Sequence, residues 1–101
     1  MQLTKEQGIA LLADLKNARI ELKKEYDLLD WATVEPEKDD GKHTDIKRLI
    51  DDIDAFEAAI EAKDEVKLGW TIFRLAVHSE DAAKHSKIAN NIWTEIGKNI
   101  H

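Results

Sequence analysis

The sequence predicts an all-α fold, a small antiparallel four-helix bundle formed by a single domain over residues 1–101. Apolar residues recur at three- and four-residue steps through most of the chain, which is the period of an amphipathic helix. Four glycines and one proline are too few for the turns of a β fold. A content of 43% hydrophobic and 36% charged residues indicates a globular domain with a charged exterior.

The first helix is predicted over residues 4–34. Thr4 and Gln7 have the T-x-x-Q spacing of a capping box, which satisfies two backbone N–H groups at a helix start. Pro36 disfavours helical geometry at the residue before it, so the helix should end near Val34 and a loop should follow. The core-facing stripe of this helix consists of Leu11, Leu15, Ala18, Leu22, Tyr26 and Leu29.

The second helix is predicted over residues 45–62. Thr44 is a suitable N-cap, and Asp45 in the first turn interacts favourably with the helix dipole. The helix should end near Lys63, because Asp64 is typical of the next N-cap. Its core stripe is the clearest in the chain and consists of Ile46, Leu49, Ile50, Ile53, Phe56 and Ile60.

The third helix, predicted over residues 65–78, is apolar on two sides. One side carries Leu68, Ile72, Leu75 and Ala76, and the other carries Val66, Trp70, Phe73 and Val77. A helix that is apolar nearly all round is expected at the centre of a bundle, buried on both sides. Gly69 lies within it and should permit the close approach of a neighbouring helix.

The fourth helix is predicted over residues 80–97, after a break at Ser79. Ser79 followed by two acidic residues has the composition of a helix start, and Gly97 fits a helix end. The later apolar residues also point to the side opposite that of the third helix: Ala82, Ala89, Ile92, Trp93 and Ile96. The alternative is three helices with one long C-terminal helix, because no Gly or Pro follows Val77 before residue 97.

The net charge of -6 is concentrated in the middle of the chain. Residues 1–29 are neutral overall, residues 30–65 carry a net charge of -8, and residues 66–101 carry +2. This distribution argues against nucleic acid or an anionic membrane surface as a partner and favours a basic protein. The chain has no cysteine, no apolar stretch of membrane-spanning length and no signal-like N-terminus, so a cytoplasmic location is expected.

Catalytic and metal-binding patterns are weak. The best metal candidate is His78, Asp81 and His85, which would share one face of an uninterrupted helix and could offer imidazole and carboxylate ligands. The alternative is two solvent-facing histidines near a helix junction, and a break at Ser79 would separate the three residues. Neither serine of the chain lies on a Gly-rich elbow, so we expect no enzymatic activity and no cofactor.

Acidic residues of the loop and the second helix form the predicted partner-binding surface, with one aromatic anchor. These residues are Trp31, Glu35, Glu37, Asp39, Asp40, Asp54, Glu57 and Glu61. On the same helix, the pairs Lys47–Asp51 and Arg48–Asp52 have the four-residue spacing of local ion pairs, which the last three acidic residues of the surface lack. The alternative is an acidic surface that only maintains solubility.

A second apolar strip on the first helix, Ile9, Ala13, Ile20 and Trp31, lies opposite its core stripe. It is either packed against a neighbour or exposed, and an exposed strip could form a homodimer through Ile9, Ile20 and Trp31. In size, acidity and helical content the chain resembles bacterial immunity proteins, antitoxins and phage-encoded inhibitors. This resemblance implies a non-enzymatic protein that masks a basic protein partner; the alternative is a homo-oligomeric helical scaffold or regulatory subunit.

Overall fold

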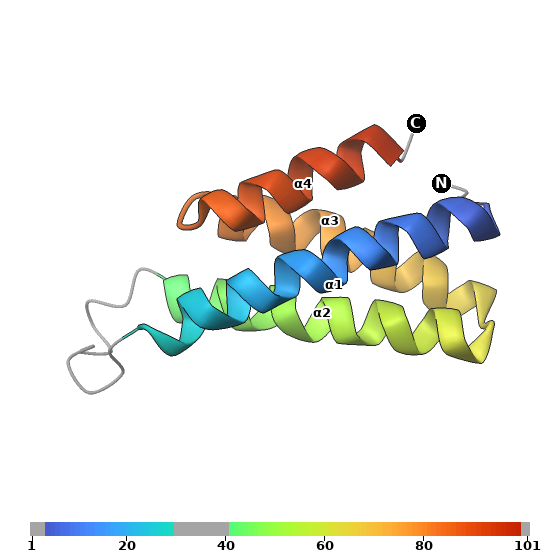
Figure 1. The fold of residues 1–101 in the computed structure, drawn as a ribbon, viewed down its shortest axis with the longest axis horizontal. Helices are drawn as coiled ribbons and strands as arrows, with labels where there is room; N and C mark the ends of the chain where they lie inside the picture. The colour runs from blue at the N-terminus through green and yellow to red at the C-terminus, as the bar shows by residue number, and fades with distance from the viewer. Residues whose placement is uncertain (1–3, 30–40, 100–101) are drawn as a thin grey trace.

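The computed structural model describes residues 4–29 and 41–99. This part of the chain forms four helices: α1 (Lys5–Asp27), α2 (Lys42–Ala62), α3 (Glu65–Ala83) and α4 (Lys87–Asn99). Successive helices run in opposite directions and pack on one another, and α4 closes the bundle against α1 (Figure 1). The predicted antiparallel four-helix bundle is therefore confirmed, and the three-helix alternative is wrong.

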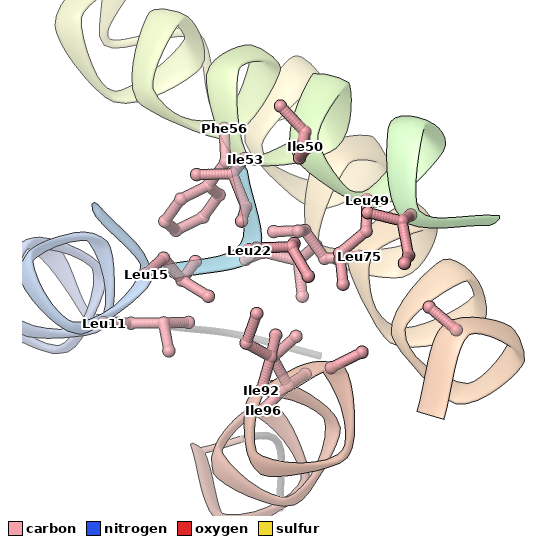
Figure 2. Close-up of a cluster of buried hydrophobic side chains, with 14 residues drawn as sticks. Leu11, Leu15, Leu22, Leu49, Ile50, Ile53, Phe56, Leu75, Ile92 and Ile96 are labelled. Carbon is pink, nitrogen blue, oxygen red and sulfur yellow. The ribbon is translucent and has the colours of Figure 1, made fainter. Parts of the chain in front are cut away.

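The core is made by one face of each helix, and these faces meet along the bundle axis (Figure 2). The apolar stripes predicted for the first two helices supply most of it. Burying each large aliphatic or aromatic side chain contributes about 1.5–3 kcal/mol. The buried residues are Leu11, Leu15, Leu22, Ile46, Leu49, Ile50, Ile53, Phe56, Ile72, Leu75, Ala82, Ala89, Ile92 and Ile96.

Two of the predicted N-terminal helix caps, Thr4 and Asp64, are present. The Gln7 backbone N–H donates to Thr4 Oγ1 at 3.1 Å, and the Thr4 N–H donates to Gln7 Oε1 at 2.9 Å, which completes the capping box. Asp64 caps α3, accepting a hydrogen bond from the Lys67 N–H at 3.1 Å. Thr44, by contrast, lies inside α2, because Gly41 is the N-cap with a left-handed φ of 88°.

The end of α1 differs from its prediction. The helix ends at Asp27, before the expected end near Val34, and Leu28 is its C-cap. The turn that follows lets Leu29 pack against the core from outside the helix. The C-terminal end of α2, by contrast, lies where the sequence predicted. Its C-cap, Lys63, has a left-handed φ of 55°, which ends the helix.

The break between α3 and α4 lies after Ala83 rather than at Ser79. Ser79 is completely buried within α3, and its hydroxyl donates to the Ala76 carbonyl at 3.1 Å, so its own helix satisfies it. Ser86 is the residue that caps α4: its Oγ accepts from the Ala89 N–H at 3.2 Å. The Ser86 hydroxyl also donates to Glu25 Oε2 at 2.8 Å, which ties this turn to α1.

The close helix approach predicted at Gly69 is also wrong. A Cβ added at Gly69 would meet no atom within 4 Å, because this residue faces outward. The buried glycine is Gly8 of α1, where an added Cβ would lie 3.8 Å from Ile60 Cδ1 of α2.

Candidate functional site

The outer face of α3 carries an exposed apolar strip, which we call the α3 strip: Val66, Trp70, Phe73 and Val77. These four residues are 72%, 64%, 52% and 40% exposed, respectively. The prediction that this helix is buried on two sides is therefore wrong. Its inner face, which includes Ile72 and Leu75, packs into the core, while no described helix covers the outer one.

The α3 strip has the geometry of a helix-packing seam. Its residues follow one another at steps of four, three and four, which places them at the a and d positions of two heptads. The Trp70 and Phe73 rings meet edge to face, with centroids 6.4 Å apart and an interplanar angle of 88°. Small Gly69 and Ala76 border one edge of the seam, and Lys67 borders the other edge.

A groove of about 430 Å³ lies between α2 and α3, beside the α3 strip. It is lined by Arg48, Asp51, Asp52, Phe73, Arg74, Val77 and His78. The Asp52 carboxylate is buried at its floor, where His78 Nδ1 contacts Oδ2 and Arg74 Nε lies 3.6 Å from Oδ1. A buried carboxylate requires such partners, since an isolated buried charge is strongly unfavourable.

The sequence did not predict these cross-helix contacts. It paired Asp52 with Arg48 along α2, but Asp52 faces α3 instead. The pair Lys47–Asp51 is confirmed, with Nζ 2.6 Å from Oδ1. This hydrogen bond to the Asp51 carboxylate raises the pKa of the exposed Lys47 ammonium above its ordinary value.

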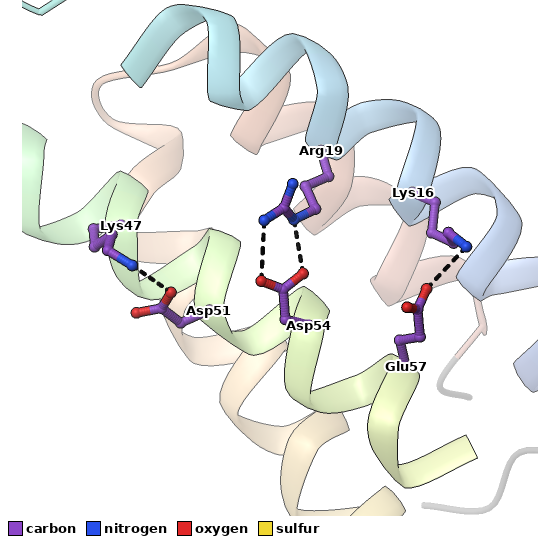
Figure 3. A network of polar contacts seen from close by, with 6 residues as sticks. All are labelled: Lys16, Arg19, Lys47, Asp51, Asp54 and Glu57. Carbon is purple, nitrogen blue, oxygen red and sulfur yellow. Dashed lines mark hydrogen bonds and ion pairs between the residues drawn. The ribbon is translucent and has the colours of Figure 1, made fainter. Parts of the chain in front are cut away.

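The helical part of the predicted acidic surface is largely compensated (Figure 3). Arg19 of α1 holds Asp54 through two contacts of 2.7 and 3.0 Å, and Lys16 lies 3.0 Å from Glu57. Among the described residues, Glu61 has no ion-pair partner. The remaining members of that surface, Trp31, Glu35, Glu37, Asp39 and Asp40, lie outside the described residues, so their role in binding stays a prediction.

The second strip, on α1, is exposed rather than packed. Ile9 and Ile20 are each about half exposed, and Ala13 between them is exposed as well. Trp31, the fourth member, lies outside the described residues. The geometry therefore removes the packed alternative for Ile9 and Ile20.

The three residues considered for a metal do not converge. His78 contacts Asp52 on α2, whereas His85 lies in the turn after α3 with Nε2 at 3.4 Å from Asp45 Oδ2. Within the described residues, no group of three His, Cys, Asp or Glu side chains could hold a metal ion. Both histidines thus contact carboxylates of α2, which joins α3 and its following turn to that helix.

Comparison with protein-family models, with curated proteins and with solved structures finds no match to this chain, so its function has to be inferred from its own geometry. None of the helices in residues 4–29 and 41–99 is both long and apolar enough to cross a membrane.

Proposed function

We propose that this protein is a non-enzymatic protein-binding module, of the inhibitor or antitoxin type, and that its contact surface is the α3 strip. The observation that carries the proposal is the alignment of this strip on the outer face of a helix whose inner face already packs in the core. Large side chains that lose their water at the centre of an interface supply most of its binding free energy, and aromatic residues are prominent among them.

The second apolar strip, on α1, is the weaker candidate for the contact surface. Ile9 and Ile20 are eleven residues apart, which separates them by about 16 Å along the helix, and only Ala13 lies between them in the strip. The members of the α3 strip are adjacent along the seam, and its two aromatic rings touch. A partner helix can therefore cover the α3 strip continuously, as a coiled-coil seam is covered.

The favoured occupant is a helix of a different protein rather than a second copy. Antiparallel pairing of two α3 helices about the seam centre would place Lys67 of one copy beside Arg74 of the other. Any self-association also brings together two chains of net charge -6. The same charge supports a partner that is basic overall, since opposite net charges accelerate association.

The test compares affinity capture from the native cell by the wild type, by Trp70→Glu and by Trp93→Glu as a matched control. Trp93 lies on α4 and is also exposed, at 42% against 64% for Trp70, so both variants replace a surface indole with a carboxylate. We expect a protein that the wild type and the control retain and that Trp70→Glu loses. For the captured partner, Trp70→Glu should raise the dissociation constant at least about 30-fold, the equivalent of about 2 kcal/mol.

Sedimentation of the purified protein distinguishes the occupants. The proposal expects a monomer at micromolar concentration. A wild-type dimer that Trp70→Glu dissociates would overturn the proposal in favour of the homo-oligomeric scaffold. Partner binding that Trp70→Glu leaves unchanged would overturn the assignment of the α3 strip.

A further inference from the structure

The groove between α2 and α3 is continuous with the α3 strip, because Phe73 and Val77 belong to both. A helix that covers the strip must therefore pass along the mouth of the groove. The polar residues of the groove then lie at the edge of the contact, where they can select the side chains that flank the partner's apolar seam.

Arg74 lies beside a buried carboxylate. The Asp52 carboxylate at the groove floor contacts His78 and lies 3.6 Å from Arg74 Nε. More than half of the Arg74 side chain remains exposed, so its guanidinium can contact a second anion. The planar guanidinium presents paired N–H donors that match the two oxygens of a carboxylate, which favours the contact.

Arg48 of α2 lines the groove on the side opposite Arg74. It makes no ion pair with another described residue, because Asp52 faces α3 and Asp51 is paired with Lys47. Lys67, one heptad before Arg74 on the same edge of α3, also has no ion-pair partner in the described part of the chain. This edge of the strip therefore carries Arg48, Lys67 and Arg74, while the two carboxylates that also line the groove, Asp51 and Asp52, already have basic partners in Lys47, His78 and Arg74.

We propose that the partner's docking segment is an amphipathic helix that carries a Glu or Asp beside its apolar seam, and that this carboxylate enters the groove between Arg48 and Arg74. Guanidinium groups recognise carboxylates through paired N–H donors, and Phe73 and Val77 provide the apolar wall for the stem of the acidic side chain. This inference rests on the proposed function, because it specifies the chemistry of the partner at the same surface.

The probes are two helical peptides with the same leucine seam, one flanked by glutamate and the other by glutamine. Titration of ¹⁵N-labelled protein, followed through the Trp70 indole signal, gives both dissociation constants. The glutamate peptide should bind about two- to fivefold more tightly for each ion pair formed, and the ratio should fall as salt is added. Arg48→Gln should lower the ratio of the two dissociation constants by the two- to fivefold factor of one ion pair, whereas Lys98→Gln on α4 should leave the ratio unchanged.

Arg48→Gln is the decisive variant because Arg48 is exposed and has no described ion-pair partner, so the fold does not depend on it. Arg74→Lys is the second variant, since it keeps a cation near Asp52 but loses the paired donors. Equal binding of the two peptides would overturn the carboxylate inference while leaving the α3 strip intact. Failure of both peptides, or glutamine-peptide binding that Trp70→Ala does not weaken, would overturn the proposed function itself.

Discussion

Two phenylalanine-to-alanine substitutions test which face of α3 belongs to the core. Phe56 of α2 is completely buried, so Phe56→Ala removes a full transfer contribution and leaves a cavity, at a cost of about 3–5 kcal/mol. Phe73 is 52% exposed, so Phe73→Ala loses roughly half of a transfer contribution of about 1.5–3 kcal/mol. It leaves no enclosed cavity, because its ring borders solvent. We therefore expect Phe73→Ala to cost about 1 kcal/mol.

Urea unfolding followed by circular dichroism measures this difference. The unfolding free energy falls by roughly 1–2 kcal/mol per molar urea. A difference in stability of at least about 2 kcal/mol between the two variants therefore separates their unfolding midpoints by about 1–2 M. Each slope has to match the wild-type value, so that the midpoints report stability alone. Equal midpoints, or a cost above about 3 kcal/mol for Phe73→Ala, would refute the exposed strip and restore the buried helix predicted from the sequence.

Three further perturbations test local features. Ser86→Ala removes the cap of α4 and its bond to α1, so it should lower the unfolding free energy in urea by about 1–2 kcal/mol. Ser79→Ala removes a buried hydroxyl that bonds only to its own helix, and alanine is the better helix former, so it should cost about 1 kcal/mol or less. Lys63→Gly should stabilise the protein by about 0.5–1 kcal/mol in thermal unfolding, because glycine adopts the left-handed conformation without strain; a loss would contradict that conformation. Asp54→Asn combined with Glu57→Gln should cost less than about 2 kcal/mol, and less again in 1 M salt. A gain in stability from the pair would show that acidic repulsion outweighs these bridges.

The bundle was predictable because its signals are local and periodic. The core stripes of α1 and α2 follow from three- and four-residue spacing, and the caps at Thr4 and Asp64 depend on residues within one turn. The position of the last break was not predictable in this way. Ser79 and Ser86 are both acceptable caps, and the choice between them is made by packing: Ser79 is buried inside α3, while Ser86 reaches Glu25 on α1.

The candidate site was only partly predictable. Ion pairs within one helix, such as Lys47–Asp51, follow from sequence spacing, but the contacts of Asp52 and Asp54 depend on which helix lies alongside. The apolar character of the outer face of α3 was evident in the sequence, yet periodicity reports that a face is apolar and not what covers it. The same pattern therefore described a central helix and an interaction surface equally well.

The acidity of the chain and the α3 strip can be understood together. An aligned apolar strip on a small protein favours association with any copy that meets it, and a shared net charge of -6 opposes that encounter. Because Asp54 and Glu57 are paired with α1, charge on this face of α2 contributes to packing as well as to the long-range field. Long-range repulsion between copies and attraction toward a basic partner are two effects of the same field, whereas Trp70 and Phe73 act only at contact. We therefore interpret the net charge as setting which molecules approach, and the α3 strip as setting how long they stay.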